Sequence, residues 1–137
     1  MESTRPRARI LVVDDEPAVR DLLAGFLQLE GYQVRVAADG TEALTELREG
    51  HFDLVISDLL MPVMGGLALL DEMARICPET WMIAMTGYNT LQTAVEALRR
   101  GAFDYVEKPF RLEVMNRAVQ RAIERPRTPP ARQKVLN

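Results

Sequence analysis

The sequence predicts an α/β fold in which five strand–helix units build one parallel, doubly wound sheet. Short apolar segments of strand length alternate with longer segments whose apolar residues recur at helical spacing. The runs Ile10–Val13 and Leu54–Ile56 are apolar throughout, as expected for strands that helices cover on both faces. With 137 residues, the chain is long enough for one such domain with a buried core.

Five segments have the composition and length of strands. They are Ile10–Val13, Gln33–Ala37, Leu54–Ser57, Trp81–Met85 and Asp104–Glu107. The second alternates apolar and polar residues and the fifth is similarly mixed, which is typical of strands at the edge of a sheet. Right-handed crossovers with these two strands at the edges predict the order 2-1-3-4-5, the flavodoxin-like arrangement.

Five further segments carry helix signals. They are Pro17–Glu30, Thr41–Glu49, Leu67–Ile76, a stripe from Leu91 to Leu98 that ends at Gly101, and a stripe from Leu112 to Ile123. Pro17 suits a first helical turn, and Gly31 suits a left-handed stop. Asp39 and Glu42 form a capping-box pattern, and Gly50 closes the helix that follows them.

The composition is that of an ordinary globular protein, with 47% hydrophobic and 27% charged residues. The single cysteine, Cys77, excludes a disulfide scaffold and a cysteine-based zinc cluster and indicates a reducing compartment. No apolar run approaches the roughly 18 residues of a membrane helix, and residues 1–9 lack the apolar core of a signal peptide. We therefore expect a cytoplasmic protein.

Charge and proline content divide the chain into three parts. Residues 111–137 carry seven Lys/Arg against two Asp/Glu, whereas residues 1–110 carry ten against eighteen. We interpret the basic end as a solvated helix and tail, in preference to a nucleic-acid contact. The expected organisation is a flexible segment at 1–8, a domain at 9–125, and a Pro/Arg-rich linker or disordered tail at 126–137.

Polar residues of particular types follow four of the five predicted strands. Asp14, Asp15 and Glu16 follow the first strand, Asp58 the third, Thr86 the fourth and Lys108 the fifth. In open α/β sheets, ligands bind outside the carboxyl ends of the strands, where the strand order reverses. The sequence therefore predicts a site between the first and third strands.

The carboxylates of Asp14, Asp15 and Asp58 would repel one another unless a cation lay among them. An all-oxygen donor set with few ligands favours Mg²⁺ over Zn²⁺ or Ca²⁺. An aspartate beside Mg²⁺ can attack phosphorus, with Thr86 and Lys108 contacting the phosphoryl oxygens. Each residue also has a purely structural explanation: a helix N-cap for the first two aspartates and for Thr86, a turn for Asp58, and a solvated surface lysine.

Four motifs give the chain a family resemblance. They are Leu-Val-Val-Asp-Asp-Glu at 11–16, Asp-Leu-Leu-Met-Pro-Val-Met-Gly-Gly at 58–66, Met-Thr-Gly-Tyr at 85–88 and Gly-Ala-Phe-Asp-Tyr-Val-Glu-Lys-Pro-Phe at 101–110. With them, residues 9–125 resemble the CheY-like receiver domain of two-component response regulators. Residues 85–110 look most like receivers that head NtrC-type transcriptional activators.

The resemblance implies a role for each site residue. Asp58 would accept a phosphoryl group from the phosphohistidine of a sensor histidine kinase, and Lys108 and Thr86 would bind that group. Asp15, Asp58 and the backbone carbonyl of Leu60 would bind Mg²⁺ directly, and Asp14 would assist largely through water. The resemblance also implies a cis peptide bond between Lys108 and Pro109.

The family also has a switch, which the resemblance places at Thr86 and Tyr105. On phosphorylation, Thr86 would move toward the phosphoryl group and Tyr105 would turn into the vacated space. The face made by the fourth helix, fifth strand and fifth helix would then change its affinity for an effector, a partner protein or a second copy of the chain. Such a domain catalyses only its own phosphorylation and dephosphorylation.

Three alternatives remain open from the sequence. A stand-alone receiver would act by protein–protein contact, whereas the Pro/Arg-rich end resembles a linker to a transcriptional effector; no DNA-binding motif is present. A Mg²⁺-dependent phosphatase would place its nucleophile after the first strand. A flavodoxin-like cofactor binder would carry a Ser/Thr/Gly phosphate loop where Asp14-Asp15-Glu16 stands.

Bulky Leu60 and Tyr88 are further expected to shield an acyl phosphate from water.

Overall fold

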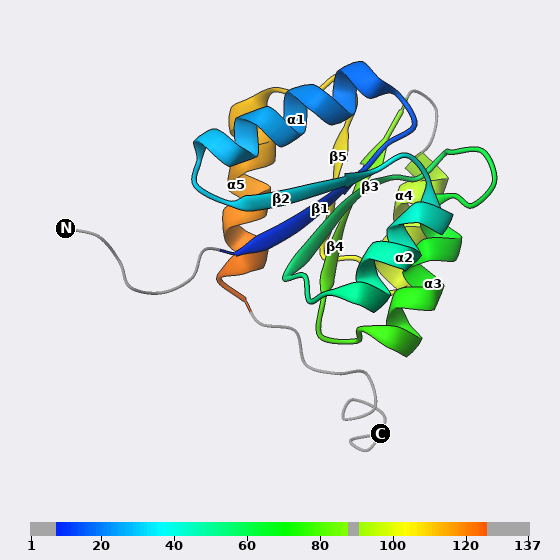
Figure 1. The fold of residues 1–137 in the computed structure, drawn as a ribbon. Coiled ribbons are helices and arrows are strands. Elements are labelled where there is room, and N and C mark those ends of the chain that lie inside the picture. The colour runs from blue at the N-terminus through cyan, green and yellow to red at the C-terminus, as the bar shows by residue number, and fades with distance from the viewer. Residues whose placement is uncertain (1–7, 88–90, 126–137) are drawn as a thin grey trace.

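The computed structural model describes residues 8–87 and 91–125, in which five parallel strands form one sheet (Figure 1). The elements in chain order are β1 (Arg9–Val13), α1 (Pro17–Leu29), β2 (Gln33–Ala37), α2 (Gly40–Glu49), β3 (Leu54–Asp58), α3 (Gly66–Ile76), β4 (Trp81–Thr86), α4 (Leu91–Arg99), β5 (Asp104–Glu107) and α5 (Leu112–Ile123). The strand order is β2-β1-β3-β4-β5, which confirms the predicted topology. The predicted terminal segments fall, apart from Ala8, outside the described residues.

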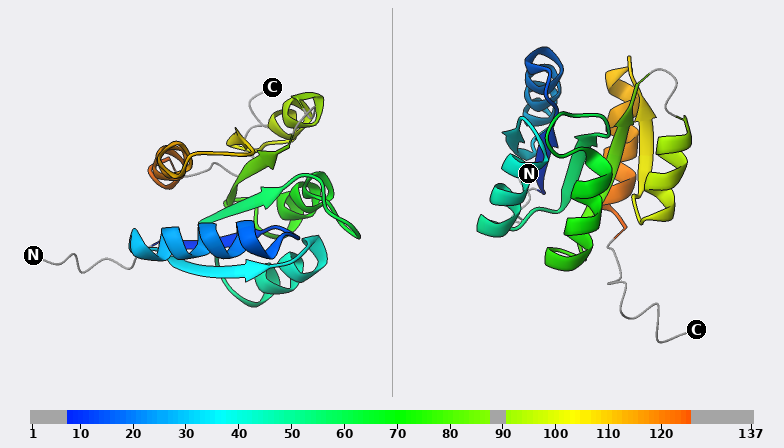
Figure 2. Two further views of the ribbon diagram at one scale, coloured as in Figure 1. Left: turned by 90° about the horizontal axis from the view of Figure 1, so that it is seen from above. Right: turned by 90° about the vertical axis from the view of Figure 1, so that its right-hand side faces the viewer.

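Helices cover both faces of the sheet, α1 and α5 on one and α2, α3 and α4 on the other (Figures 1 and 2). Successive strand side chains point to opposite faces, so each strand serves two cores. In β1, Ile10 and Val12 pack toward α1 and α5, whereas Leu11 and Val13 pack toward the other three helices. This two-sided burial explains why the central strands are apolar throughout.

The strands and helices begin and end within one or two residues of the predicted positions, and their caps show why. Gly31 and Gly101 have φ angles of 99° and 110°, the left-handed conformation predicted for Gly31. Asp39 caps α2 by accepting a hydrogen bond from the Glu42 N–H at 2.9 Å. Gly50 is the C-cap of α2, as predicted, but its φ of −160° is extended and not left-handed, so the chain leaves the helix in an extended conformation.

The loop after β3 requires small residues because it passes directly against the strand end. A Cβ atom on Gly66 would lie 2.6 Å from the carbonyl oxygen of Asp58, and one on Gly65 would lie 2.8 Å from that of Leu59. The Gly66 N–H donates a hydrogen bond to the Leu59 carbonyl at 3.1 Å. Val63, at the exposed tip of this loop, has φ 70°, a strained conformation for a β-branched residue. The loop thereby holds the backbone around Asp58 in one place.

No helix within the described ranges is long and apolar enough to span a membrane.

Candidate functional site

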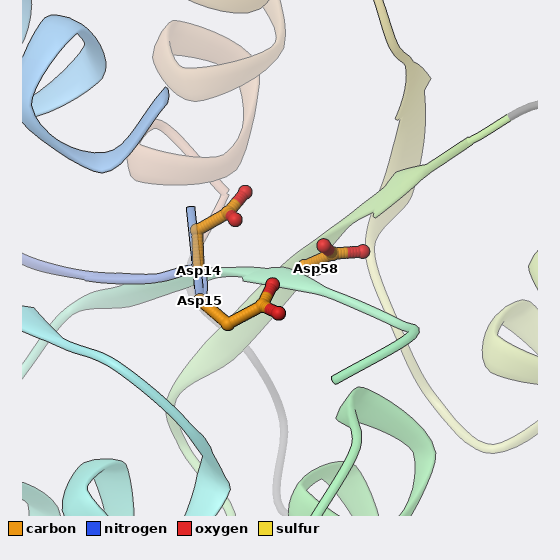
Figure 3. Close-up of side chains that lie close together, drawn as sticks. All are labelled: Asp14, Asp15 and Asp58. Carbon is orange, nitrogen blue, oxygen red and sulfur yellow. The ribbon is translucent and has the colours of Figure 1, made fainter. Parts of the chain in front are cut away.

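The register of the two central strands brings Asp14 and Asp58 together. β1 and β3 are neighbours, and Val13 pairs with Ser57, so the next residue of each strand emerges at the same edge of the sheet. Asp15 follows Asp14, and one carboxylate oxygen from each of the three aspartates lies within 4.8 Å of the others. Figure 3 shows the three side chains gathered at this edge. The predicted acidic cluster is therefore present.

Two turns orient the carboxylates of Asp14 and Asp58 in the same way. Asp14 Oδ1 accepts a hydrogen bond from the Glu16 N–H at 2.9 Å, and Asp58 Oδ1 accepts one from the Leu60 N–H at 3.1 Å. Each aspartate thus closes a turn on the backbone two residues ahead, as the structural explanation of Asp58 predicted. The turn uses only one oxygen of each carboxylate and leaves the second oxygen for the site.

The alternative explanation of Asp14 and Asp15 as helix caps is wrong. The N-cap of α1 is Glu16, and its side chain makes no capping hydrogen bond. Pro17 occupies the start of the helix, where a missing N–H costs little.

Lys108 lies between the two buried carboxylates. Its Nζ atom is 2.7 Å from Asp14 Oδ2 and 3.0 Å from Asp58 Oδ2, and its side chain is 16% exposed. Burial by itself lowers the pKa of Lys108, but the contacts with Asp14 and Asp58 outweigh it and raise that pKa above its usual value. The ammonium group is therefore charged at physiological pH. The peptide bond to Pro109 is cis, as expected.

The electrostatic environment of Asp58 disfavours its negative charge. Burial is the largest cause that raises the pKa of Asp58 above its usual value, and the charge of Asp14 adds to it. The hydrogen bonds from Lys108 and the Leu60 N–H act in the opposite direction without cancelling it. The ionised carboxylate is thus less favourable here than in water, even with Lys108 in contact.

The acidic cluster has the properties of a site for a hard divalent cation. Asp14 Oδ2 is buried and, although Lys108 lies close to it, accepts no hydrogen bond of good geometry. Asp15 is exposed and gives access from solvent. Within the described part of the chain, the cluster contains carboxylate oxygens and neither histidine nor cysteine. These donors fit Mg²⁺ and do not resemble a zinc site.

Thr86 lies on β4 and Tyr105 on β5, the two strands that follow β3 on the side away from β1. Thr86 is buried at the end of β4, and its carbonyl accepts a 2.7 Å hydrogen bond from the Lys108 N–H. Tyr105 pairs in register with Ala84, two residues before Thr86, so alternation places both side chains on the sheet face that α4 covers. Tyr105 is half-buried there, against the core beneath α2, α3 and α4. The two residues are diagonal neighbours, as a coupled pair requires.

The structure adds two residues, Glu16 and Arg20, whose contacts at the site the sequence pattern does not predict. Lys108 Nζ also lies 3.4 Å from Glu16 Oε1, and Arg20 Nη1 donates a 2.9 Å hydrogen bond to the Asp14 carbonyl. One signal was present for Glu16, since glutamate is not among the residues favoured at an N-cap. No comparable signal marked Arg20, whose contact depends on the turn of α1.

The change Asp58→Asn is expected to raise the free energy of unfolding at pH 7 by about 1 kcal/mol, because it removes an anion that burial disfavours. Since folding raises the pKa of Asp58, ionised Asp58 destabilises the fold at neutral pH. That effect disappears as the pH falls below the pKa of the unfolded state. Urea denaturation without divalent cations, at pH 7 and about pH 3, measures the difference.

Asp15→Asn provides the matched control for this measurement. Its carboxylate is exposed, so its stability is expected to change by less than about 0.5 kcal/mol. An Asp58→Asn protein less stable than the unmodified chain at pH 7 would contradict the electrostatic analysis.

Known proteins share both the sequence and the fold. Residues 10–120 match the response regulator receiver domain family. The regulatory protein AtoC of Escherichia coli K12 is 47% identical over 116 residues, which cover 85% of this chain and 25% of that protein. The transcriptional regulator NtrC of Azospirillum brasilense is 40% identical over 124 residues, covering 90% and 26%. The chain thus spans about a quarter of the length of these relatives.

Solved structures agree with this match. The receiver domain of NtrX from Brucella abortus superposes with a TM-score of 0.81 at 42% identity, covering 84% of this chain and 98% of that one. A response regulator receiver domain from Clostridium thermocellum gives 0.82 at 33% identity, covering 95% and 99%. The chain therefore belongs to the response regulator receiver domain family, with relatives among the NtrC-type regulators.

Proposed function

We propose that this chain receives a phosphoryl group on Asp58 from the phosphohistidine of a sensor histidine kinase, with Mg²⁺ bound beside it. One observation carries the proposal. Asp58 is a buried carboxylate with a raised pKa, placed between two further aspartates and a charged lysine at the end of a central strand. Such a carboxylate is an oxygen nucleophile in a site whose remaining negative charge a cation would neutralise.

The roles of the other residues follow from their positions. Asp15, Asp58 and the Leu60 carbonyl would hold Mg²⁺ directly, and Asp14 would do so through water. When bound, the metal neutralises charge on the transferring phosphoryl oxygens. An oxygen of Asp58 forms the new bond to phosphorus, and the bond from phosphorus to the histidine nitrogen breaks. The phosphohistidine ring reacts with its other nitrogen protonated, so that neutral imidazole is left on the kinase. Lys108 and the Thr86 hydroxyl bind phosphoryl oxygens.

Phosphorylation would then act on β4 and β5. The phosphoryl group adds about −1.5 to −2 charges at Asp58, and Lys108 and Thr86 are the groups placed to meet them. Movement of Thr86 would open space on the face it shares with Tyr105, and the Tyr105 ring would turn into it. The domain would thus have two arrangements of Thr86 and Tyr105, one before and one after this movement. Phosphorylation can shift the equilibrium between them only by the difference in its interaction free energy with each.

The surface beside this switch is suited to a protein partner. β5 lies between α4 and α5, as the right-hand view of Figure 2 shows. Leu91, Val95 and Leu98 share one exposed face of α4, and Val114 is exposed on α5. Tyr105 and Val114 also line a groove with Pro109 and Phe110. This face would carry the output, as an effector contact or a phosphorylation-dependent dimer.

The output itself is proposed to be transcriptional. The relatives named above include transcriptional regulators about four times as long as the matched segment, so an effector would follow the receiver in the longer protein. A cytoplasmic location suits a chain with a single cysteine. A stand-alone receiver that acts by protein contact remains the alternative.

The proposed acceptor is tested by intact mass after incubation with acetyl phosphate, with Mg²⁺ or with a chelator. We expect one phosphoryl group on the unmodified chain, only with Mg²⁺, and none on Asp58→Asn. Hydroxylamine should remove the group, since it cleaves acyl phosphates. Asp21→Asn, at an exposed position of α1, is the matched control and should react as the unmodified chain does. Absence of any adduct, or an adduct on Asp58→Asn, would contradict the proposal.

Leu60→Asn is expected to shorten the lifetime of the phosphorylated chain about three- to tenfold. Leu60 is an exposed apolar side chain two residues after Asp58, and asparagine at this position could orient water toward the acyl phosphate. The decay is followed by intact mass after removal of the phosphodonor. Val114→Asn, an exposed apolar residue away from Asp58, is the control. An unchanged lifetime would remove the shielding role of Leu60. Tyr88, the second predicted shield, lies outside the described residues.

Tyr105→Ala is expected to be phosphorylated normally while losing most of the response of α4 and β5, because no ring remains to move when Thr86 moves. Backbone amide chemical shifts, measured before and after phosphorylation, report that response. Tyr105→Phe retains the ring and should keep the response of the unmodified chain. Equal shift changes in the alanine variant and the unmodified chain would show that the ring is not the switch.

A further inference from the structure

Glu16 occupies a position that its residue type does not favour. N-caps favour Ser, Thr, Asp and Asn because a short side chain can accept a hydrogen bond from the first turn. Glu16 is the N-cap of α1 and makes no such bond. Its carboxylate lies instead 3.4 Å from Lys108 Nζ, a contact across 92 residues of sequence. A residue that breaks a local preference while contacting the site indicates a function there.

Lys108 contacts three carboxylates that differ in exposure. The side chain of Asp14 is fully buried and that of Asp58 is 10% exposed, whereas that of Glu16 is 63% exposed. Glu16 is therefore the outermost of the three, on the solvent side of the ammonium group. An incoming phosphodonor would meet this carboxylate before it reaches Asp58.

The charge balance gives that position a consequence. With a divalent cation bound as proposed above, the charges of the cation and Lys108 balance those of Asp14, Asp15 and Asp58. Glu16 then adds a negative charge at the entrance, where its side chain is 63% exposed, whereas the guanidinium of Arg20, a second cation beside the cluster, is bonded to the Asp14 carbonyl. A single charge there repels free anions, and the repulsion is reduced by salt.

From this arrangement we infer that Glu16 is a donor-specificity residue, which disfavours small anionic phosphodonors and leaves phosphohistidine on a docked protein as the preferred source. A docked kinase gains its binding energy from a wide protein contact, so one charge affects it little. A small acyl phosphate has only its own charge and a few contacts, so the same charge affects it strongly. The inference rests on the proposed phosphorylation of Asp58.

The test compares two small donors on the full chain and on three variants. Acetyl phosphate is a dianion at neutral pH, and phosphoramidate carries less net negative charge. Glu16→Gln removes the charge of this side chain, and Glu16→Asp keeps it. Glu107→Gln is the matched control. Glu107 is exposed and precedes Lys108 in the sequence, but among the described residues it makes no ion pair with the Lys108 ammonium group. Phosphorylation rates are measured by intact mass with saturating Mg²⁺, at ionic strengths of about 0.05 M and about 0.5 M.

Glu16→Gln is expected to react about three- to tenfold faster with acetyl phosphate, with a smaller gain for phosphoramidate and a gain that shrinks at high salt. Glu16→Asp and Glu107→Gln should keep the donor ratio of the unmodified chain. Calorimetry should also show that Glu16→Gln binds Mg²⁺ about two- to threefold more weakly, because one nearby anion is lost.

Three results would overturn the inference: an unchanged donor ratio in Glu16→Gln, an equal gain for both donors that salt does not alter, or unchanged Mg²⁺ affinity. Each of these can be observed while the unmodified chain is still phosphorylated on Asp58, and the proposed function then stands. If the unmodified chain is not phosphorylated in Mg²⁺, the proposed function fails and the role of Glu16 falls with it.

Discussion

The ion pairs of Lys108 with Asp14 and Asp58 are the interaction on which the rest of the site depends. They join the ends of β1 and β3 to the loop after β5, which lies at the edge of the sheet. Without an ammonium group between them, two carboxylates on adjacent strands would repel each other in a buried setting. The strand order brings the carboxylates together, and the length of the lysine side chain lets an edge strand reach them. A doubly wound sheet therefore supplies the geometry that the charges need.

The same arrangement leaves the site short of positive charge. Burial and Asp14 raise the pKa of Asp58 even though Lys108 is close, so the folded protein holds a carboxylate that is more costly than an exposed one. The loop after β3 fixes this group through close backbone approaches at Gly65 and Gly66, which prevent it from relaxing away. Stability is lost at this point, and under the proposed function this loss accompanies a nucleophile held where a cation and a phosphoryl group could meet it.

Most of the fold and the identity of the cluster could be predicted because both depend on patterns along the chain. Apolar runs and edge-strand alternation determine the strand order, and residues that follow parallel strands necessarily share one edge of the sheet. What could not be predicted depends on side-chain conformation. The extended φ of Gly50 and the reach of Glu16 toward Lys108 follow from local packing, which spacing does not encode. Asp14 and Asp58 each take part in both a turn and an ion pair, because the turn uses one carboxylate oxygen and leaves the second for Lys108, and residue spacing does not encode this division.

Lys108 also connects the acidic cluster to β4 through its own backbone. Its N–H donates to the carbonyl of Thr86, while its ammonium group contacts Asp14 and Asp58. A change of charge at Asp58 would therefore act on β4 by two routes, through the Thr86 hydroxyl and through the backbone that Lys108 shares with Thr86. Both routes end beside Tyr105, which faces the core beneath α4. Packed cores change between discrete arrangements and deform little in between, so under the proposed function a small displacement at this strand end would be enough to move the ring between two positions.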